Sequence, residues 1–384
     1  MKANKAILVL NDQTIYYGWS FSKPLTSKGE IVFNTGMTGY QEIITDPSYT
    51  EQIVTFTYPE IGNTGINNED NEAKAAYVKG IIARNICLQP NNWRKSQSLI
   101  KYLEKNNILH IYGFDTRSLT QHLRKYGTMN GCISTKILKP NILLKEFHNE
   151  SNYTEQDLVQ TVSTKKMYEI KKILPYKPVY KKNTQNIPKY ELKIIIIDFG
   201  TKENILRSLL LYVKQIIVIP AQSSVNEILD HKPDGILLSN GPGDPKAVKY
   251  AISTVKQLLE YKIPIFGICM GHQVLSLALG MDSFKLTFGH RGLNHPIGYN
   301  NTIEISSQNH GFAINNNGDE LKHIFINQMN YNDNTIAGLS HRKYPCFAVQ
   351  YHPEACPGPR DSYNLFLHFI TVVQIHKQYP QIIY

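Results

Sequence analysis

The chain has 384 residues, of which 42% are hydrophobic and 19% charged, enough apolar material for two or three buried cores. This composition excludes a disordered protein, a collagen-like repeat and a disulfide scaffold. The formal net charge of +10 comes mainly from scattered lysines, and arginine, the residue that reads bases and phosphates best, is scarce. The charge therefore does not indicate a nucleic-acid partner.

No apolar run approaches the length of a membrane span, since the densest one, residues 194–197, is only four residues long. Lys2 and Lys5 precede a short apolar stretch, but Asn11 ends it too early for a signal peptide. We therefore expect a soluble globular protein without a membrane partner. The chain is rich in Ile, Lys, Asn and Tyr, which share A/T-rich codons. This bias, together with the expected absence of a transit peptide, predicts a plastid-encoded protein of the chloroplast stroma. The alternative is a cytoplasmic protein of a bacterium with a similar genome.

The cysteines are odd in number and include no Cys-x-x-Cys pair, which favours reduced thiols over a disulfide framework or a zinc site. One of them is therefore a candidate nucleophile. They are Cys87, Cys132, Cys269, Cys346 and Cys356.

The N-terminal part alternates short apolar and polar stretches separated by glycine and proline, a pattern typical of β-strands. Residues 30–33 and 52–56 are examples. Apolar residues at helical spacing predict a helix within residues 96–106, and a second helix is expected to begin after Asp115, a suitable N-cap. We expect a β-rich α+β domain over residues 1–174.

From residue 175 to about 190 the sequence changes to Pro, Lys, Tyr and Asn without apolar periodicity, which predicts a linker over residues 175–191. A second domain is then expected over residues 192–384. Its apolar runs alternate between strand and helix patterns, as in an open, mainly parallel sheet flanked by helices, so the fold class is α/β. Strands are predicted at 193–198, 215–220, 235–239 and 264–268, helices at 204–212 and 247–261, and antiparallel strands within 302–349.

The sharpest motif is Gly-Ile-Cys-Met-Gly-His-Gln at residues 267–273, where a short strand pattern meets a helix pattern. Small residues on both sides of Cys269 permit the tight strand-to-helix turn that exposes a nucleophile at the carboxyl end of a sheet. The partial positive charge of a helix N-terminus favours the thiolate. The alternative is a structural cysteine in a glycine-rich turn.

A thiol nucleophile needs a base, and the base needs a group that orients it. His352-Pro353-Glu354 supplies both, because residues i and i+2 of an extended chain project to one side and proline favours that conformation. The other histidines are expected to lack such a carboxylate. A third motif, the Gly/Pro turn at residues 239–245, offers backbone N–H groups for an anion or an oxyanion, although it also fits an ordinary strand-ending turn. No nucleotide-phosphate motif is found.

These three motifs resemble the signatures of class I glutamine amidotransferases, which hydrolyse the side-chain amide of glutamine through a cysteinyl thioester. The N-terminal half resembles the small subunit of carbamoyl-phosphate synthase. This second resemblance rests on blocks in order along nearly the whole chain: residues 33–42, 45–49, 57–59, 61–63, 115–117, 130–132, 288–296 and 307–312.

The resemblance implies that Cys269 is the nucleophile, His352 the acid and base, and Glu354 the group that orients it. It also implies glutamine-binding roles at further positions. Among these, Met270 replaces the usual leucine, which a backbone role tolerates. Cys356, two residues after Glu354, is not one of these positions and is interpreted as a bystander. The implied L-glutamine contacts are Ser48, Gly241, Gly243, Met270, Gln273, Asn309, Gly311 and Phe312.

The same resemblance implies a partner, the large subunit, in a heterodimer or a higher oligomer that makes carbamoyl phosphate for arginine and pyrimidine biosynthesis. ATP and Mg or Mn are expected on that subunit, with no cofactor or metal on this chain. Two alternatives are an amidotransferase that serves anthranilate or guanylate formation, which would not require residues 1–170 as they stand, and a non-catalytic RNA-binding or regulatory protein.

Overall fold

The computed structural model describes residues 2–147, 156–171, 189–316 and 322–380. Their contacts divide the chain into an N-terminal unit, Met1–Gln156 with Thr287–Gly292, and a C-terminal unit, Asp157–Leu286 with Leu293–Tyr384. The predicted linker lies outside the described residues except for residues 189–191. In the ranges that are described, no helix is long and apolar enough to cross a membrane.

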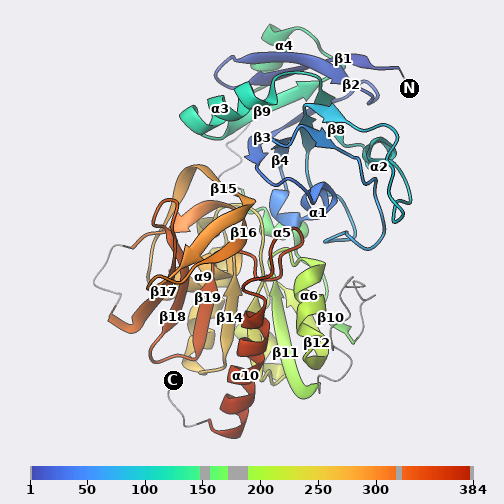
Figure 1. Ribbon diagram of the computed structural model, residues 1–384. Helices are drawn as coiled ribbons and strands as arrows, with labels where there is room; N and C mark the ends of the chain where they lie inside the picture. The colour runs from blue at the N-terminus through green and yellow to red at the C-terminus, as the bar shows by residue number, and fades with distance from the viewer. Residues whose placement is uncertain (1, 148–155, 172–188, 317–321, 381–384) are drawn as a thin grey trace. The chain divides into compact units, whose positions relative to one another are not determined.

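The β-rich N-terminal unit is built on a closed barrel (Figure 1). Three neighbouring pairs, β3–β4, β4–β6 and β6–β8, are parallel, and the others are antiparallel. The strands predicted at 30–33 and 52–56 lie within β3 and β4. Around the barrel the order is β1 (Asn4–Leu10), β2 (Ile15–Ser20), β8 (Leu109–Tyr112), β6 (Gly80–Ala83), β4 (Gln52–Phe56), β3 (Thr26–Asn34) and β9 (Met129–Ser134). A separate short pair is formed by β5 (Glu60–Ile61) and β7 (Asn85–Ile86).

The helices of this unit follow local sequence signals, as α3 (Thr116–Tyr126) illustrates. The carboxylate of Asp115 accepts the first free N–H groups of α3, from Arg117 at 3.0 Å and Ser118 at 3.1 Å. Leu119 and Leu123 are fully buried, and Gly127, whose φ is 93°, caps the C-terminal end of the helix. The predicted N-cap is therefore confirmed. The other helices are α1 (Tyr40–Thr45), the 3₁₀ helix η1 (Pro47–Tyr49), α2 (Leu99–Lys105) and α4 (Pro140–Phe147).

One strand, β15 (Ser283–Gly298), leaves the C-terminal unit and returns to it, because residues 287–292 belong to the N-terminal unit. Within that unit the ring of Phe288 stacks on Phe33 with 5.8 Å between the ring centroids. The backbone N–H of Thr35 donates to the carbonyl of Arg291 at 3.1 Å. This segment therefore completes the N-terminal unit.

The C-terminal unit contains a ten-stranded sheet. Five adjacent strands are parallel to one another: β12, β11, β13, β14 and β19. At one edge β10 pairs antiparallel with β12, and on the other side the pairs β19–β18, β18–β17 and β17–β15 are antiparallel. The parallel part is thus confined to half of the sheet. In order, the strands are β10 (Tyr168–Ile170), β12 (Val213–Pro220), β11 (Tyr190–Asp198), β13 (Gly235–Leu238), β14 (Ile265–Ile268), β19 (Cys346–Val349), β18 (Ile336–His341), β17 (Ile324–Asn330), β15 and β16 (Glu304–Ile314).

Both faces of the parallel strands are covered by helices, because continuous apolar runs bury side chains on each side. Ile194 and Ile196 belong to one hydrophobic cluster with α6 and α10, whereas Ile195 and Ile197 belong to another with α7, α8 and α9. The helices are α5 (Val159–Val162), α6 (Glu203–Leu209), α7 (Val225–Asp230), the 3₁₀ helix η4 (Pro245–Ala247), α8 (Lys249–Glu260), α9 (Met270–Ala278) and α10 (Asn364–Gln378).

Candidate active site

Cys269 lies at a sharp turn between β14 and α9, with φ of 54° and ψ of −103°, a conformation that is rare outside glycine. The flanking glycines are required by space. A Cβ on Gly271 would lie 2.1 Å from the carbonyl oxygen of Leu238, and one on Gly267 would lie 2.7 Å from that of Gly271. The Gly-x-Cys-x-Gly spacing therefore builds the predicted elbow and puts the thiol at the N-terminus of α9.

His352 and Glu354 follow the adjacent strand, β19, and both side chains are buried. Nδ1 of His352 lies 2.6 Å from Oε1 of Glu354. The backbone N–H of His352 also donates to the carbonyl of Ser307 at 2.9 Å, which fixes the chain at this point. The predicted pairing of these two side chains is thus present in the structure.

Lys202 is a member of this cluster that the sequence analysis missed. Its buried ammonium lies 3.0 Å from Oε1 of Glu354 and donates to the carbonyl of Ala355 at 2.6 Å. The amide of Asn204 donates to the backbone carbonyl of Glu354, and Asn240 accepts from the backbone N–H of Lys202 at 3.1 Å. A signal was present: Lys202 lies in the short turn between β11 and α6, at the sheet edge where open α/β folds place their sites.

The charges of the cluster support one another. Burial opposes the ionised form of Glu354, but the ammonium of Lys202 and the imidazole of His352 outweigh burial and lower the pKa of Glu354. Burial likewise opposes the charged form of His352. The interactions of the ring with Glu354, and to a smaller extent with Cys269, outweigh burial and raise the pKa of His352. The site therefore favours an imidazolium held between a carboxylate and a sulfur.

Two contacts define the surroundings of the sulfur besides His352. Sγ of Cys269 donates to the backbone carbonyl of Asn309 at 3.5 Å, and the side-chain amide of Gln350 donates to Sγ at 3.9 Å. Nε2 of His352 is buried and makes no hydrogen bond of ordinary geometry to a described residue, so it can exchange a proton with the sulfur or with a ligand.

The turn at residues 239–245 adjoins the elbow. The backbone N–H of Gly271 donates to the carbonyl of Ser239 at 2.9 Å, which ties the turn to α9. A Cβ on Gly241 would lie 2.3 Å from the carbonyl oxygen of Phe199, and Gly243 has a φ of 90°. Glycine is therefore needed at both positions, and the turn presents its backbone beside the first turn of α9.

The remaining predicted glutamine contacts divide between the units. Met270 is the first residue of α9, Gln273 lies one turn later, and Asn309, Gly311 and Phe312 lie on β16. Nε2 of Gln273 donates to the carbonyl of Phe312 at 2.8 Å, so these elements are connected. Ser48 belongs to the N-terminal unit, where it is buried in η1 and its N–H donates to Asp46 at 2.9 Å.

The expectation that no other histidine has a carboxylate partner is wrong. Nε2 of His122 on α3 lies 2.6 Å from Oδ2 of Asp12. Sequence reasoning missed this pair because Asp12 lies in the turn between β1 and β2, far from His122 along the chain.

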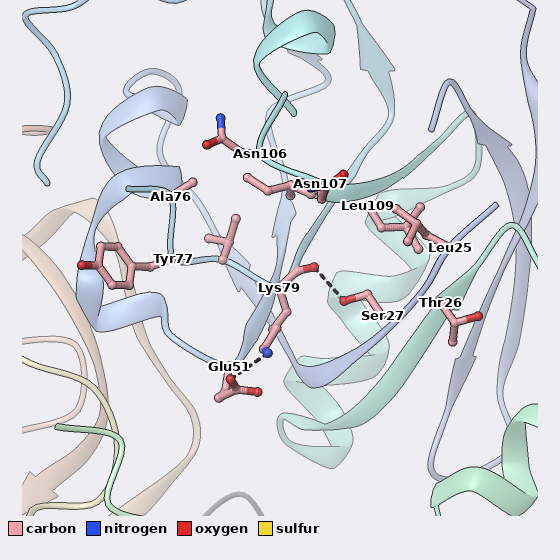
Figure 2. Close-up of a pocket in the computed structure, with 12 residues that line it drawn as sticks. Leu25, Thr26, Ser27, Glu51, Ala76, Tyr77, Lys79, Asn106, Asn107 and Leu109 are labelled. Carbon is pink, nitrogen blue, oxygen red and sulfur yellow. Dashed lines mark hydrogen bonds and ion pairs between the residues drawn. The ribbon is translucent and has the colours of Figure 1, made fainter. Parts of the chain in front are cut away.

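The N-terminal unit contains a hollow of about 320 Å³ whose lining includes none of the predicted site residues (Figure 2). Two of its lining residues, Lys79 and Glu51, form an ion pair of 2.8 Å, and Oγ of Ser27 donates to the carbonyl of Lys79 at 2.7 Å. These polar groups therefore satisfy one another at the surface of the barrel.

Family comparisons match both halves of the chain. A model described as carbamoyl-phosphate synthase small chain, CPSase domain, matches residues 8–133, and one described as glutamine amidotransferase class-I matches residues 195–372. The match to residues 8–133 disfavours the alternatives of an anthranilate or guanylate amidotransferase.

Whole-length relatives give the same result. The chain is 55% identical over 382 residues to the carbamoyl phosphate synthase small chain of Gracilaria tenuistipitata var. liui, covering 97% of this chain and 95% of that protein. It is 54% identical over 390 residues to that of Pyropia yezoensis, covering 98% and 99%. It is 52% identical over 379 residues to that of Synechocystis sp., covering 98% and 97%.

Proposed function

The chain belongs to the carbamoyl-phosphate synthase small-chain family, and from this premise we propose that Cys269, His352 and Glu354 hydrolyse glutamine in it. As a family member it is the glutaminase subunit of glutamine-hydrolysing carbamoyl-phosphate synthase. The observation that carries the residue assignment is the 2.6 Å contact between His352 and Glu354 beside the Cys269 elbow.

In the proposed reaction, Sγ of Cys269 attacks the side-chain carboxamide carbon of glutamine. His352 takes the thiol proton and gives it to the leaving nitrogen, so the C–N bond breaks and ammonia and a thioester form. Water then attacks the thioester with His352 as base, which releases glutamate and restores the thiol. Glu354, itself paired with Lys202, holds the ring and stabilises the imidazolium.

The oxyanion of each tetrahedral intermediate is proposed to accept hydrogen bonds from the backbone N–H groups of Met270 and Gly243. The position of Met270 supports this role, because the first N–H groups of a helix have no acceptor within the helix. The roles of Ser48, Gly241, Gln273, Asn309, Gly311 and Phe312 in binding glutamine stay predictions from the family resemblance.

Family membership implies a large subunit, and we propose that this chain forms a heterodimer, or a higher oligomer of heterodimers, with it. Bicarbonate activation and the ATP- and metal-dependent steps would then take place on the partner, with ammonia passed between the subunits. The A/T-biased composition and the relatives in red algae and cyanobacteria support a plastid location. Fractionation that recovers the chain outside plastids would exclude that location.

The test of the proposed function is Cys269→Ser in the complex with the large subunit. Synthesis of carbamoyl phosphate from glutamine should fall by several orders of magnitude, because the nucleophile is lost, whereas synthesis from free ammonia should persist. Cys87→Ser, which changes a half-buried cysteine of the N-terminal unit, is the matched control and should retain both activities. Glutamine-dependent synthesis that survives in Cys269→Ser would refute the assignment.

A further inference from the structure

Gln350 lies between β19 and His352 and has only 2% of its surface exposed. Its backbone N–H donates to the carbonyl of Ala337 on β18 at 2.9 Å, so its main chain is fixed by the sheet. Its side-chain amide extends to the nucleophile, with Nε2 at 3.9 Å from Sγ of Cys269. Neither the proposed reaction nor the family resemblance assigns this residue a role.

The orientation of the Gln350 amide follows from a chain of hydrogen bonds that begins at a backbone carbonyl. The carbonyl of Phe312 is only an acceptor, so the Gln273 side chain must present its N–H₂ group to it, at 2.8 Å. The same nitrogen donates at 3.1 Å to the side chain of Gln350, which must therefore present its oxygen. An N–H group of Gln350 is consequently left to face the sulfur.

The two contacts of the sulfur favour different protonation states. A thiol can donate its proton to the carbonyl of Asn309, whereas a thiolate has no proton to donate and is repelled by a carbonyl oxygen. The N–H of Gln350, in contrast, interacts best with a negatively charged sulfur, because hydrogen bonds to charged groups are the stronger kind.

We propose that Gln350 is a positioning residue that donates an N–H to the Cys269 thiolate and, through Gln273, links the state of the nucleophile to the substrate-binding side. This inference rests on the proposed function, since it assumes that Cys269 reacts as a thiolate. The network runs from β16 through α9 to the chain that follows β19, so its parts lie on rigid elements.

Other titratable groups lie on the elements around the sulfur and must be held constant in a test. His352 interacts with Cys269, and it is paired with Glu354, which is paired in turn with Lys202. His272 on α9 is buried, and burial lowers its pKa to about 3, so it stays neutral. His310 on β16 is bonded at Nδ1 to the carbonyl of Phe312. Substitution of Gln350 changes none of these side chains.

The experiment measures the pH dependence of iodoacetamide alkylation of Cys269 in the complex without glutamine, followed on the Cys269 peptide by mass spectrometry. Gln350→Met keeps the size but removes the N–H, and should raise the pH midpoint of alkylation by about one unit. Gln350→Glu puts a carboxylate beside the sulfur and should raise the midpoint further. In turnover assays kcat should fall about tenfold in Gln350→Met, with a smaller change in KM.

The matched control is Gln41→Met, because Gln41 is a similarly buried amide, 4% exposed, that bonds to Asn67 and Asn71 in the N-terminal unit instead of the sulfur. It should lower the melting temperature and leave the alkylation midpoint unchanged. The inference is overturned if either folded Gln350 variant alkylates with the wild-type midpoint. Such a result would leave the proposed function intact, because that function fails only if Cys269→Ser remains active with glutamine.

Discussion

The two units each contain a histidine paired with a carboxylate at the same distance, 2.6 Å, yet the two pairs differ in their surroundings. The side chains of His352 and Glu354 in the C-terminal unit are 2% and 0% exposed, whereas those of His122 and Asp12 in the N-terminal unit are 18% and 36% exposed. Of these two pairs, only the buried one has a further charged side chain in contact with its carboxylate, the ammonium of Lys202. A short contact alone therefore does not indicate a reactive site; exclusion of water and a further charge are what give the pair its chemistry.

A third histidine separates the effect of burial from the effect of charge. His110 on β8 is buried in the barrel, where Nε2 accepts from the N–H of Phe21 at 2.9 Å and Nδ1 lies 3.0 Å from Oγ of Ser22. No carboxylate offsets its burial, which lowers the pKa of His110 to about 4. Burial thus neutralises His110, and Glu354 reverses that effect at His352.

The largest effect is expected from Glu354→Gln, which keeps the shape of the side chain but removes its charge. Glutamine hydrolysis should fall about ten-thousand-fold, because the imidazolium loses its stabilising partner, with a modest change in KM. Steady-state glutaminase turnover measures both. Glu203→Gln, which removes the charge of a half-buried carboxylate paired with Arg207 at 2.6 Å, is the control and should hydrolyse glutamine normally. Near-normal turnover in Glu354→Gln would reduce Glu354 to a packing role.

A second effect concerns stability. Glu354→Gln leaves the Lys202 ammonium buried without its carboxylate, which should cost about 3–5 kcal/mol. Adding Lys202→Met removes that charge, so the double variant should be more stable than Glu354→Gln alone. Both tryptophans, Trp19 and Trp93, belong to the N-terminal unit, so their fluorescence does not report on the C-terminal unit directly. The stability of the C-terminal unit is therefore measured by hydrogen exchange of the backbone amides of β11 and β14. If the free energy of unfolding lost in the double variant equals the sum of the losses in Glu354→Gln and Lys202→Met, the two charges are not coupled.

The third effect is the pH dependence of the barrel. The pKa of His110 in the folded chain lies below its unfolded value of about 6.5, so its contribution to stability is complete above pH 6.5 and is lost as the pH falls toward 4. The loss is on the order of 3 kcal/mol. Urea unfolding followed by tryptophan fluorescence between pH 7 and 4.5 should show a shallower decline in His110→Gln. Equal slopes in both proteins would assign the acid sensitivity to other groups.

The smallest effect is expected at the exposed pair. His122→Gln should change the free energy of unfolding by less than about 1 kcal/mol, because water screens the ion pair. The same fluorescence measurement in low and high salt applies, and His122→Gln leaves the separate contact of Asp12 with Thr14 in place. If His122→Gln lost as much free energy of unfolding as Glu354→Gln, burial would not be what distinguishes the two pairs.

The sequence predicts local features of this molecule better than distant ones. The parallel strands, the Asp115 cap and the Cys269 elbow depend on residues next to one another, and all were predicted. Closure of the barrel depends on pairing such as that of Leu10 with Gly131, which no local pattern specifies. Lys202 and Gln350 were missed because a lysine or glutamine in a sequence indicates an exposed position, and only the fold shows that both are buried.

The path of β15 limits how the gene could be divided. Its residues 287–292 supply Phe288 and Arg291 to the N-terminal unit although they are encoded inside the amidotransferase half. A gene cut between the two family matches would therefore give an N-terminal product that lacks part of its own fold. Recombination that exchanges whole amidotransferase halves between relatives would have to preserve these six residues as a compatible set. The N-terminal unit is therefore expected to depend on the amidotransferase half for its fold, even though each half carries its own family signature.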